Sequence, residues 1–230
     1  MPSRHGGERQ LAAERLGCKP SQLLDASTSL VPWTPWCLPF APLPIRDYPD
    51  RRYSGLVQAL ATVHGLDPSS VLPGNGAAEL FTWVARDAVA AGLSRLPAPG
   101  FADYSRALRC WDGRIAETPL PLSWSGSFPQ QCPDSGGGDV IWICNPHNPT
   151  GQLWSRASIE PLLSRFALVI CDEAFLSLVP DGEQQSLIPL AAEHSNLVVI
   201  RSLTKLYGIA GLRLGYAVAH PERLQRWAEW

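Results

Sequence analysis

The sequence predicts an α/β fold, in which a mostly parallel central sheet is sandwiched between helices. Four short apolar runs occur in the second half of the chain, at residues 140–144, 167–171, 197–200 and 216–219. Segments long enough for helices or loops separate these runs. Unbroken apolar runs of this length are typical of strands that are buried on both faces. The 230 residues suffice for one sizeable domain or two small ones.

The first half of the chain predicts mainly helices and irregular segments. Residues 1–24 are polar, with one helix near 8–16, and residues 25–50 are extended and broken by prolines. Residues 53–64 carry apolar side chains at a helical period. The remaining segments are a turn at 71–76, a helix at 77–91, a loop at 97–104, a helix at 104–110 and a surface loop at 124–139.

Charge and composition exclude several classes of partner. The 19 basic side chains nearly balance the 21 acidic ones, so neither nucleic acid nor an anionic membrane is expected as a partner. The N-terminus lacks the apolar region of a signal peptide, and no apolar run approaches the length of a membrane span. The six cysteines form no C-x-x-C pair, which favours reduced thiols and a cytoplasmic protein, and no metal site is expected.

The segment 199–216 carries the most informative chemistry. It places Lys205 close to two hydroxyl residues, Ser202 and Thr204, and to Arg213. Hydroxyl donors and a planar cation are what a phosphate group needs, and a fixed amine can attack an aldehyde. An amine beside a phosphate site suggests pyridoxal phosphate held as a Schiff base. The Ser-x-x-Lys spacing also occurs in serine acyl-transfer enzymes, but their S-D-N and K-T-G companions are missing.

Two further polar groups follow predicted strands. Asp172 closes the run 167–171, where a buried acid needs a cationic partner such as a protonated pyridine nitrogen. A metal carboxylate or a helix N-cap are the alternatives, and the chain has no G-x-x-x-x-G-K-[ST] loop to support the first. The loop 144–151, with two Asn-Pro steps, follows another strand and is either a ligand site or a plain turn.

The order of these motifs resembles the fold-type I aminotransferase superfamily, class I/II. N-P-T-G at 148–151 precedes D-E-A-F at 172–175 and S-L-T-K at 202–205, and the resemblance covers about residues 45–230. It implies a pyridoxal-phosphate-binding large domain of the aspartate-aminotransferase type at 46–230. It also implies that residues 1–45 form an N-terminal arm and part of a small domain, and that the C-terminal small domain is absent from this chain.

The resemblance assigns a role to each matching residue. Lys205 resembles the Schiff-base lysine that also moves the Cα proton, Asp172 the partner of the pyridine nitrogen, and Asn148 the donor to the phenolic oxygen. The phosphate ligands it implies are Ser202, Thr204, Arg213, and the backbone of Gly76 and Ala77 at the start of a helix.

Aromatic residues complete the implied site. Phe101 lies where the family stacks a ring on the pyridine, although Phe101 and Tyr104 are most simply core aromatics. Tyr48 resembles a tyrosine that reaches the partner subunit's cofactor in a homodimer. Phe175 stands where many members have a tyrosine, which removes one hydrogen bond worth on the order of 1 kcal/mol.

Several segments look like one branch of the superfamily, the threonine-phosphate decarboxylases of cobalamin biosynthesis, with histidinol-phosphate aminotransferases as close relatives. These segments are 5–7, 99–104, 172–175 and 201–207. The branch implies that His5 grips a substrate phosphate, whereas a histidine near a terminus is usually just solvated. Ser29 stands where a substrate-binding asparagine is expected. The implied substrate is a small amino acid or amino phosphate, and the alternatives are an aminotransferase or a cofactor-binding remnant without catalysis.

Overall fold

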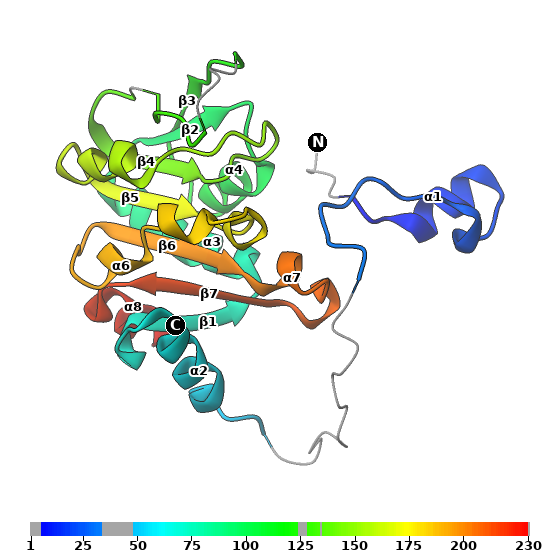
Figure 1. Cartoon of the computed structure of the whole chain (residues 1–230), viewed down its shortest axis with the longest axis horizontal. Helices are drawn as coiled ribbons and strands as arrows, with labels where there is room; N and C mark the ends of the chain where they lie inside the picture. The colour runs from blue at the N-terminus through cyan, green and yellow to red at the C-terminus, as the bar shows by residue number, and fades with distance from the viewer. Residues whose placement is uncertain (1–5, 34–47, 124–127, 134, 230) are drawn as a thin grey trace.

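The computed structural model describes residues 6–33, 48–123, 128–133 and 135–229, which form one sheet with helices on both faces and an N-terminal segment beside one end of it (Figure 1). The strands are β1 (Val71–Asn75), β2 (Ser94–Ala98), β3 (Ile115–Pro119), β4 (Gly138–Cys144), β5 (Phe166–Asp172), β6 (Leu197–Ser202) and β7 (Leu214–Ala219). The α-helices are α1 (Arg9–Leu16), α2 (Ser54–His64), α3 (Ala77–Ala91), α4 (Ala102–Arg109), α5 (Arg156–Ile159), α6 (Ile188–Ala191), α7 (Leu203–Leu206) and α8 (Pro221–Ala228). The 3-10 helices are η1 (Pro20–Gln22), η2 (Pro68–Ser70), η3 (Glu160–Ser164), η4 (Leu176–Leu178), η5 (Gly182–Gln185) and η6 (Ala210–Leu212).

The seven strands lie in the order β1-β7-β6-β5-β4-β2-β3. The neighbours from β3 to β6 are parallel, while β7 is antiparallel to both β6 and β1. Only β7 therefore runs against the other strands. Its first residues lie at the same edge as the last residues of β6 and β1, as the pairing of Ser202 with Gly215 and of Asn75 with Leu214 shows.

Alternation along the strands divides the buried side chains between two cores. Leu168 and Ile170 of β5 pack with α3, α4 and α8, whereas Val169 and Cys171 pack with α2, α5 and α6 on the other face. Successive side chains of a strand point to opposite faces, so strands covered on both sides must be apolar throughout. The same alternation continues to the strand ends, where it decides which polar side chains share a face.

The four predicted strands of the second half are confirmed, and so are the helices predicted at 53–64, 77–91 and 104–110, within two residues at each end. The mostly parallel sheet is confirmed as well. The turn predicted at 71–76 is wrong, because residues Val71–Asn75 form β1, which pairs with β7 alone. An edge strand can hold Pro73 because its unpaired side needs no N–H donor.

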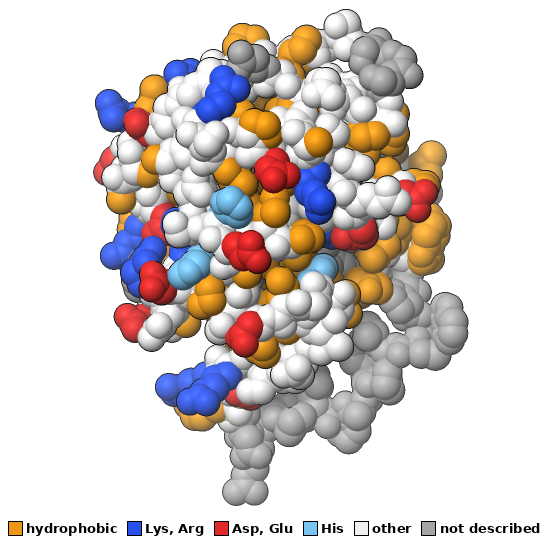
Figure 2. Space-filling view, turned by 60° about the vertical axis from the view of Figure 1, so that its left-hand side comes forward, with side chains coloured by type: hydrophobic (Ala, Val, Ile, Leu, Met, Phe, Trp, Pro, Cys, Tyr) orange, Lys and Arg blue, Asp and Glu red, His pale blue; other side chains and the backbone are white. Residues whose placement is uncertain are grey.

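On the face that Figure 2 shows, basic and acidic side chains are interspersed with hydrophobic ones. No helix among the described residues is long and apolar enough to cross a membrane. Across the same residues, no group of three or more His, Cys, Asp or Glu side chains is arranged to hold a metal ion.

Candidate active site

A cavity of about 840 Å³ lies at the edge of the sheet where the parallel strands end. Its wall is built by the segments that follow β4, β5 and β6, by the starts of α3 and α4, and by the N-terminal segment. The predicted site residues that line it are Ser29, Ala77, Phe101, Asn148, Asp172, Ser202, Thr204, Lys205 and Arg213. The topology thus brings together groups that lie as far apart as residues 29 and 213.

Lys205 lies on α7, directly after β6, and lines the cavity. Burial lowers the pKa of its ammonium group, and the charge of Arg213 acts in the same direction, while the carboxylate of Asp172 opposes them. The amine Nζ is 5.4 Å from the centre of the Phe175 ring. A lowered pKa leaves a larger share of the amine neutral and nucleophilic, which is the property that attack on an aldehyde requires.

Asp172 is the last residue of β5 and is 4% exposed. Its Oδ2 accepts a hydrogen bond of 2.6 Å from the Tyr104 hydroxyl, and its Oδ1 accepts one of 2.9 Å from the backbone N–H of Ala174. Burial raises the pKa of Asp172 to about 6, against the lowering effect of these hydrogen bonds and of Lys205. A cationic partner on the open side of the cavity would hold this carboxyl ionised.

A group of hydroxyl and guanidinium donors lies at another part of the wall. The hydroxyls of Ser202 and Thr204 lie 2.7 Å apart, and Arg213 lies directly before β7, where its Nη1 donates to the carbonyl of Ala210. Because β7 runs antiparallel to β6, it begins at the edge of the sheet where β6 ends, and this places Arg213 beside the cavity. Two hydroxyls, a guanidinium and the N-terminus of the 15-residue helix α3 are groups of the kind that bind a phosphate.

Gly76 and Gly215 are required by the close approach of these parts. A Cβ on Gly76 would lie 2.5 Å from Nη2 of Arg213, and one on Gly215 would lie 2.7 Å from the backbone N of Ala77. Gly76 also has a φ of +77°, a conformation that L side chains rarely adopt. The donor set and the glycines therefore fit a bound phosphate group at the entrance of α3.

Asn148 is half-buried in the loop after β4 and lines the cavity. The loop is fixed by its own polar groups, since the side chain of Asn145 bonds both the N–H and the carbonyl of Trp154, at 2.8 and 2.9 Å. The backbone N–H of Asn148 donates to Cys144 Sγ. These hydrogen bonds fix the conformation of the loop, which presents the side-chain amide of Asn148 to the cavity.

The N-terminal predictions have mixed outcomes. Ser29 lines the cavity together with its neighbours Ser27 and Thr28. His5 lies outside the described residues, and the first described residue, Gly6, lines the cavity. Tyr48 is 95% exposed and does not line the cavity, so its predicted role in a partner's site stays a prediction.

Sequence reasoning missed the polar role of Tyr104, which was predicted as a core aromatic. The ring is indeed buried, but its hydroxyl reaches Asp172. The available signal was its place three residues after Phe101, one helical turn along. Two charged residues of the wall were also missed, Asp103 and Arg106, which form an ion pair of 2.9 Å with each other.

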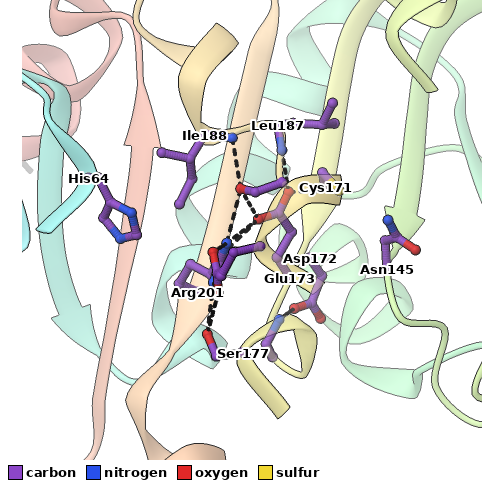
Figure 3. A network of polar contacts seen from close by, with 12 residues as sticks. His64, Asn145, Cys171, Asp172, Glu173, Ser177, Leu187, Ile188 and Arg201 are labelled. Atoms are coloured by element: carbon purple, nitrogen blue, oxygen red, sulfur yellow. Dashed lines mark hydrogen bonds and ion pairs between the residues drawn. The ribbon is translucent and has the colours of Figure 1, made fainter. Parts of the chain in front are cut away.

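A second polar network lies on the opposite face of the same strand ends (Figure 3). The Arg201 guanidinium contacts Glu173 Oε2 at 2.7 Å and Glu183 Oε1 at 2.8 Å. Glu173 also accepts hydrogen bonds from the Ser186 hydroxyl and the Leu187 N–H, at 2.8 and 2.7 Å. Because Glu173 follows Asp172 and Arg201 precedes Ser202, this network ties together the two strand ends that carry the cavity residues.

Comparisons with known proteins agree with this arrangement. A profile of the aminotransferase class I and II family matches residues 44–229. The chain is 37% identical over 240 residues to threonine-phosphate decarboxylase of Salmonella typhimurium, covering 94% of this chain and 62% of that protein. It is 33% identical over 179 residues to histidinol-phosphate aminotransferase of Lactiplantibacillus plantarum, covering 74% of this chain and 49% of that one.

A similar solved structure is L-threonine-O-3-phosphate decarboxylase from Porphyromonas gingivalis. It superposes with a TM-score of 0.67 at 29% identity, over 81% of this chain and 55% of that one. The chain therefore spans between about half and three fifths of the length of the relatives it matches.

Proposed function

Because the chain belongs to the class I and II aminotransferase family, whose cofactor is pyridoxal 5′-phosphate, we propose that it is a decarboxylase of an amino acid phosphate. The substrate we infer is L-threonine O-3-phosphate, and the product is (R)-1-aminopropan-2-yl phosphate, a precursor for cobalamin biosynthesis. The observation that carries the proposal is the convergence of Lys205, Asp172 and the phosphate donors on one cavity.

The residues of the cavity fit the cofactor group by group. Lys205 would bond it covalently through Nζ, and Asp172 would accept a hydrogen bond from its protonated ring nitrogen. Asn148 would donate to its phenolic oxygen, and Phe101 would cover one face of its ring. Its phosphate would be held by Ser202, Thr204, Arg213 and the backbone at Gly76 and Ala77.

When bound, the cofactor withdraws electrons from the bond that breaks at the substrate's Cα. In decarboxylation that bond joins Cα to the carboxylate, which leaves as carbon dioxide while a proton takes its place on Cα. Lys205 is the group placed to deliver this proton, because its amine has a lowered pKa and lies in the same cavity. The decarboxylation is therefore a balanced reaction without a second substrate.

The N-terminal segment is the part we assign to the substrate. Ser29 and its hydroxyl neighbours line the cavity beside Gly6, so a substrate phosphate can find donors there that the cofactor does not use. We include His5 in the same role. The 37% identity to threonine-phosphate decarboxylase supports this choice of substrate.

The second candidate is an aminotransferase on a phosphorylated or aromatic amino acid, favoured by the 33% identity to histidinol-phosphate aminotransferase. We also propose that the active form is a cytoplasmic homodimer, in which Tyr48 of one protomer reaches the cofactor of its partner. The full exposure of Tyr48 is compatible with that contact.

The test combines a covalent trap with a product assay. Borohydride reduction of the cofactor-loaded chain, followed by peptide mass mapping, is expected to find a pyridoxyl group on Lys205. The chain should release carbon dioxide from L-threonine phosphate without a keto acid, whereas an amino transfer that requires a keto acid would establish the second candidate. Binding of the cofactor without either reaction would refute both.

Lys205→Ala is the matched variant for this test. Because it removes the only amine that lines the cavity among the described residues, both the trapped adduct and the turnover should be lost completely. An adduct that persists at another lysine in this variant would disprove the assignment.

A further inference from the structure

We propose that Tyr104 is a positioning residue, whose hydroxyl holds Asp172 as an ionised carboxylate aimed into the cavity. This inference rests on the proposed cofactor site, because its consequence is a charge for the cofactor's ring nitrogen. It extends that site by a residue that does not itself line the cavity.

The geometry leaves the carboxyl of Asp172 little freedom. Tyr104 donates to Oδ2 at 2.6 Å and the Ala174 N–H donates to Oδ1 at 2.9 Å, so each oxygen is engaged by one donor from the protein. Two donors that come from different elements, α4 and the turn after β5, fix both the position and the rotation of the group. The remaining acceptor capacity of the oxygens faces the cavity that Asp172 lines.

The Tyr104 ring cannot move away from this contact, because it is 1% exposed and is enclosed by other aromatic rings. Its centre lies 5.1 Å from that of Phe81, 5.5 Å from that of Phe101 and 5.2 Å from that of Trp142. The contact with Phe101 joins the hydroxyl to the residue proposed to cover the cofactor ring. One side chain thus positions two parts of the site.

The charged groups around Asp172 leave Tyr104 as the main group that keeps it ionised. Burial raises the pKa of Asp172 and the neighbouring Glu173 adds to that, while Tyr104, Ala174 and Lys205 lower it, with Tyr104 first among them. The thiols of Cys144 and Cys171 are buried and have raised pKa values, so they carry no charge here. Burial also raises the pKa of Tyr104 well above 10, so its hydroxyl remains a proton donor at working pH.

Removal of this donor should therefore raise the pKa of Asp172 above about 6 and neutralise part of it near neutral pH. A hydrogen bond to a charged group is worth enough to move the midpoint by about one pH unit or more. Tyr104→Phe removes the hydroxyl and keeps the ring. Its matched control is Tyr216→Phe, which removes another buried hydroxyl, bonded to His64 Nε2 at 2.8 Å on the other face of the sheet.

The readout is the dissociation constant of pyridoxal 5′-phosphate against pH, measured by equilibrium dialysis. The cofactor's own titrations are common to all variants, so the difference between curves reports the protein. We expect the pH at which affinity falls to move up by about one unit in Tyr104→Phe and not to move in Tyr216→Phe. Cofactor binding by Tyr104→Phe should then be about twofold weaker at about pH 7 and about tenfold weaker at about pH 5. In an Asp172→Asn background, Tyr104→Phe should add no further shift.

Failure of the inference and failure of the proposed function give different results. If borohydride traps no adduct on Lys205 of the parent chain, the proposed function is wrong. If the adduct forms but the Tyr104→Phe curve coincides with that of the parent chain, the positioning role is wrong. Should Tyr104→Phe not fold, incorporation of 3-fluorotyrosine, whose hydroxyl is a stronger donor, must lower the midpoint, and an unchanged midpoint would overturn the inference.

Discussion

The carboxyl of Asp172 is the residue at which stability and the proposed function oppose each other. Its pKa in the folded chain is about 6, above the 3.8 of an exposed carboxyl, because burial disfavours the charge. A raised folded pKa stabilises the folded state at low pH, and this contribution is lost as the pH rises through about 6. Above that pH, the chain without cofactor holds a buried charge that Tyr104, the Ala174 N–H and Lys205 stabilise only in part, and a bound cation would stabilise it further.

Asp172→Asn should therefore stabilise the cofactor-free chain above about pH 6, by on the order of 3 kcal/mol, and abolish turnover. The gain should shrink as the pH falls toward 4, where Asp172 is protonated in the folded state. Urea unfolding of both chains between about pH 4 and about pH 8 measures the difference. A difference that stays constant over this range would contradict the raised pKa.

Gly76 offers a second prediction at the residue scale. Gly76→Ala places a Cβ 2.5 Å from Arg213 Nη2 at a φ of +77°, so it should cost about 1–2 kcal/mol of unfolding free energy and weaken cofactor binding. Gly55→Ala is the control, because nothing lies within 4 Å of its Cβ position in α2, and it should stabilise the chain by about 0.5–1 kcal/mol. Equal cofactor affinity in both variants would show that Arg213 simply moves aside.

At the scale of elements, the sequence predicted the strands that are apolar throughout and missed those that are not. β4 to β7 each contain an unbroken apolar run, whereas the short strands β2 and β3 are interrupted by Pro97, Pro119 and charged residues. β3 lies at the edge of the sheet, where a strand needs neither an apolar pattern on both faces nor every N–H. The reversal of β7 could not be predicted, because its apolar pattern is the same in either direction.

The candidate site was predictable to the extent that it lies at strand ends. Lys205, Asp172 and Asn148 each follow an apolar run, and all three line the cavity. Tyr104 was not predictable as a polar partner, because its contact with Asp172 joins residues 68 positions apart through a helix that the sequence does not orient. Local pattern indicates which residues reach the edge of the sheet, and tertiary packing decides which of them touch.

The ion pairs behind the site give a prediction for β5 and β6. Arg201 is buried, with its side chain 4% exposed, so Arg201→Met leaves Glu173 buried without a counter-charge and should cost about 3–5 kcal/mol. Glu183 is 54% exposed, and Glu183→Gln should cost less than about 1 kcal/mol. Urea unfolding at neutral pH compares the two variants. If both variants lose the same unfolding free energy, the ion pair between Arg201 and Glu173 does not stabilise the ends of β5 and β6.

At the scale of the whole molecule, we propose that the N-terminal segment and a second protomer complete the site. Ser27, Thr28 and Ser29 approach the cavity from a segment whose backbone contacts α7 through the Val31 N–H and the Lys205 carbonyl, 3.5 Å apart. Tyr48 is 95% exposed, which is compatible with the proposed contact to another chain. The site is thus assembled from parts that lie at both ends of the sequence.

Mixing one weakened and one inactive variant tests the proposed dimer. In a homodimer of Tyr48→Ala, both sites lack the tyrosine of the partner and should be weakened. In a homodimer of Lys205→Ala, both sites lack the amine that bonds the cofactor. A mixed dimer contains one site with an intact Lys205 and an intact Tyr48 from the other chain, so activity should return on mixing. Sedimentation should show a dimer in each preparation, and a mixture whose activity does not exceed the sum of its two components would place Tyr48 outside the partner's site.

The reversed direction of β7 has a consequence for how this protein can change over evolution. The short connection that carries Lys205 and Arg213 must leave β6 and enter its antiparallel neighbour β7 at the same level, because Ser202 pairs with Gly215, and it must bring both the amine and the guanidinium to the cavity. Surface connections commonly accept added or deleted residues, but this one works as a spacer of set length. Length variation should therefore be tolerated after Gly136, where a Cβ would meet nothing within 4 Å, and selected against between positions 206 and 212.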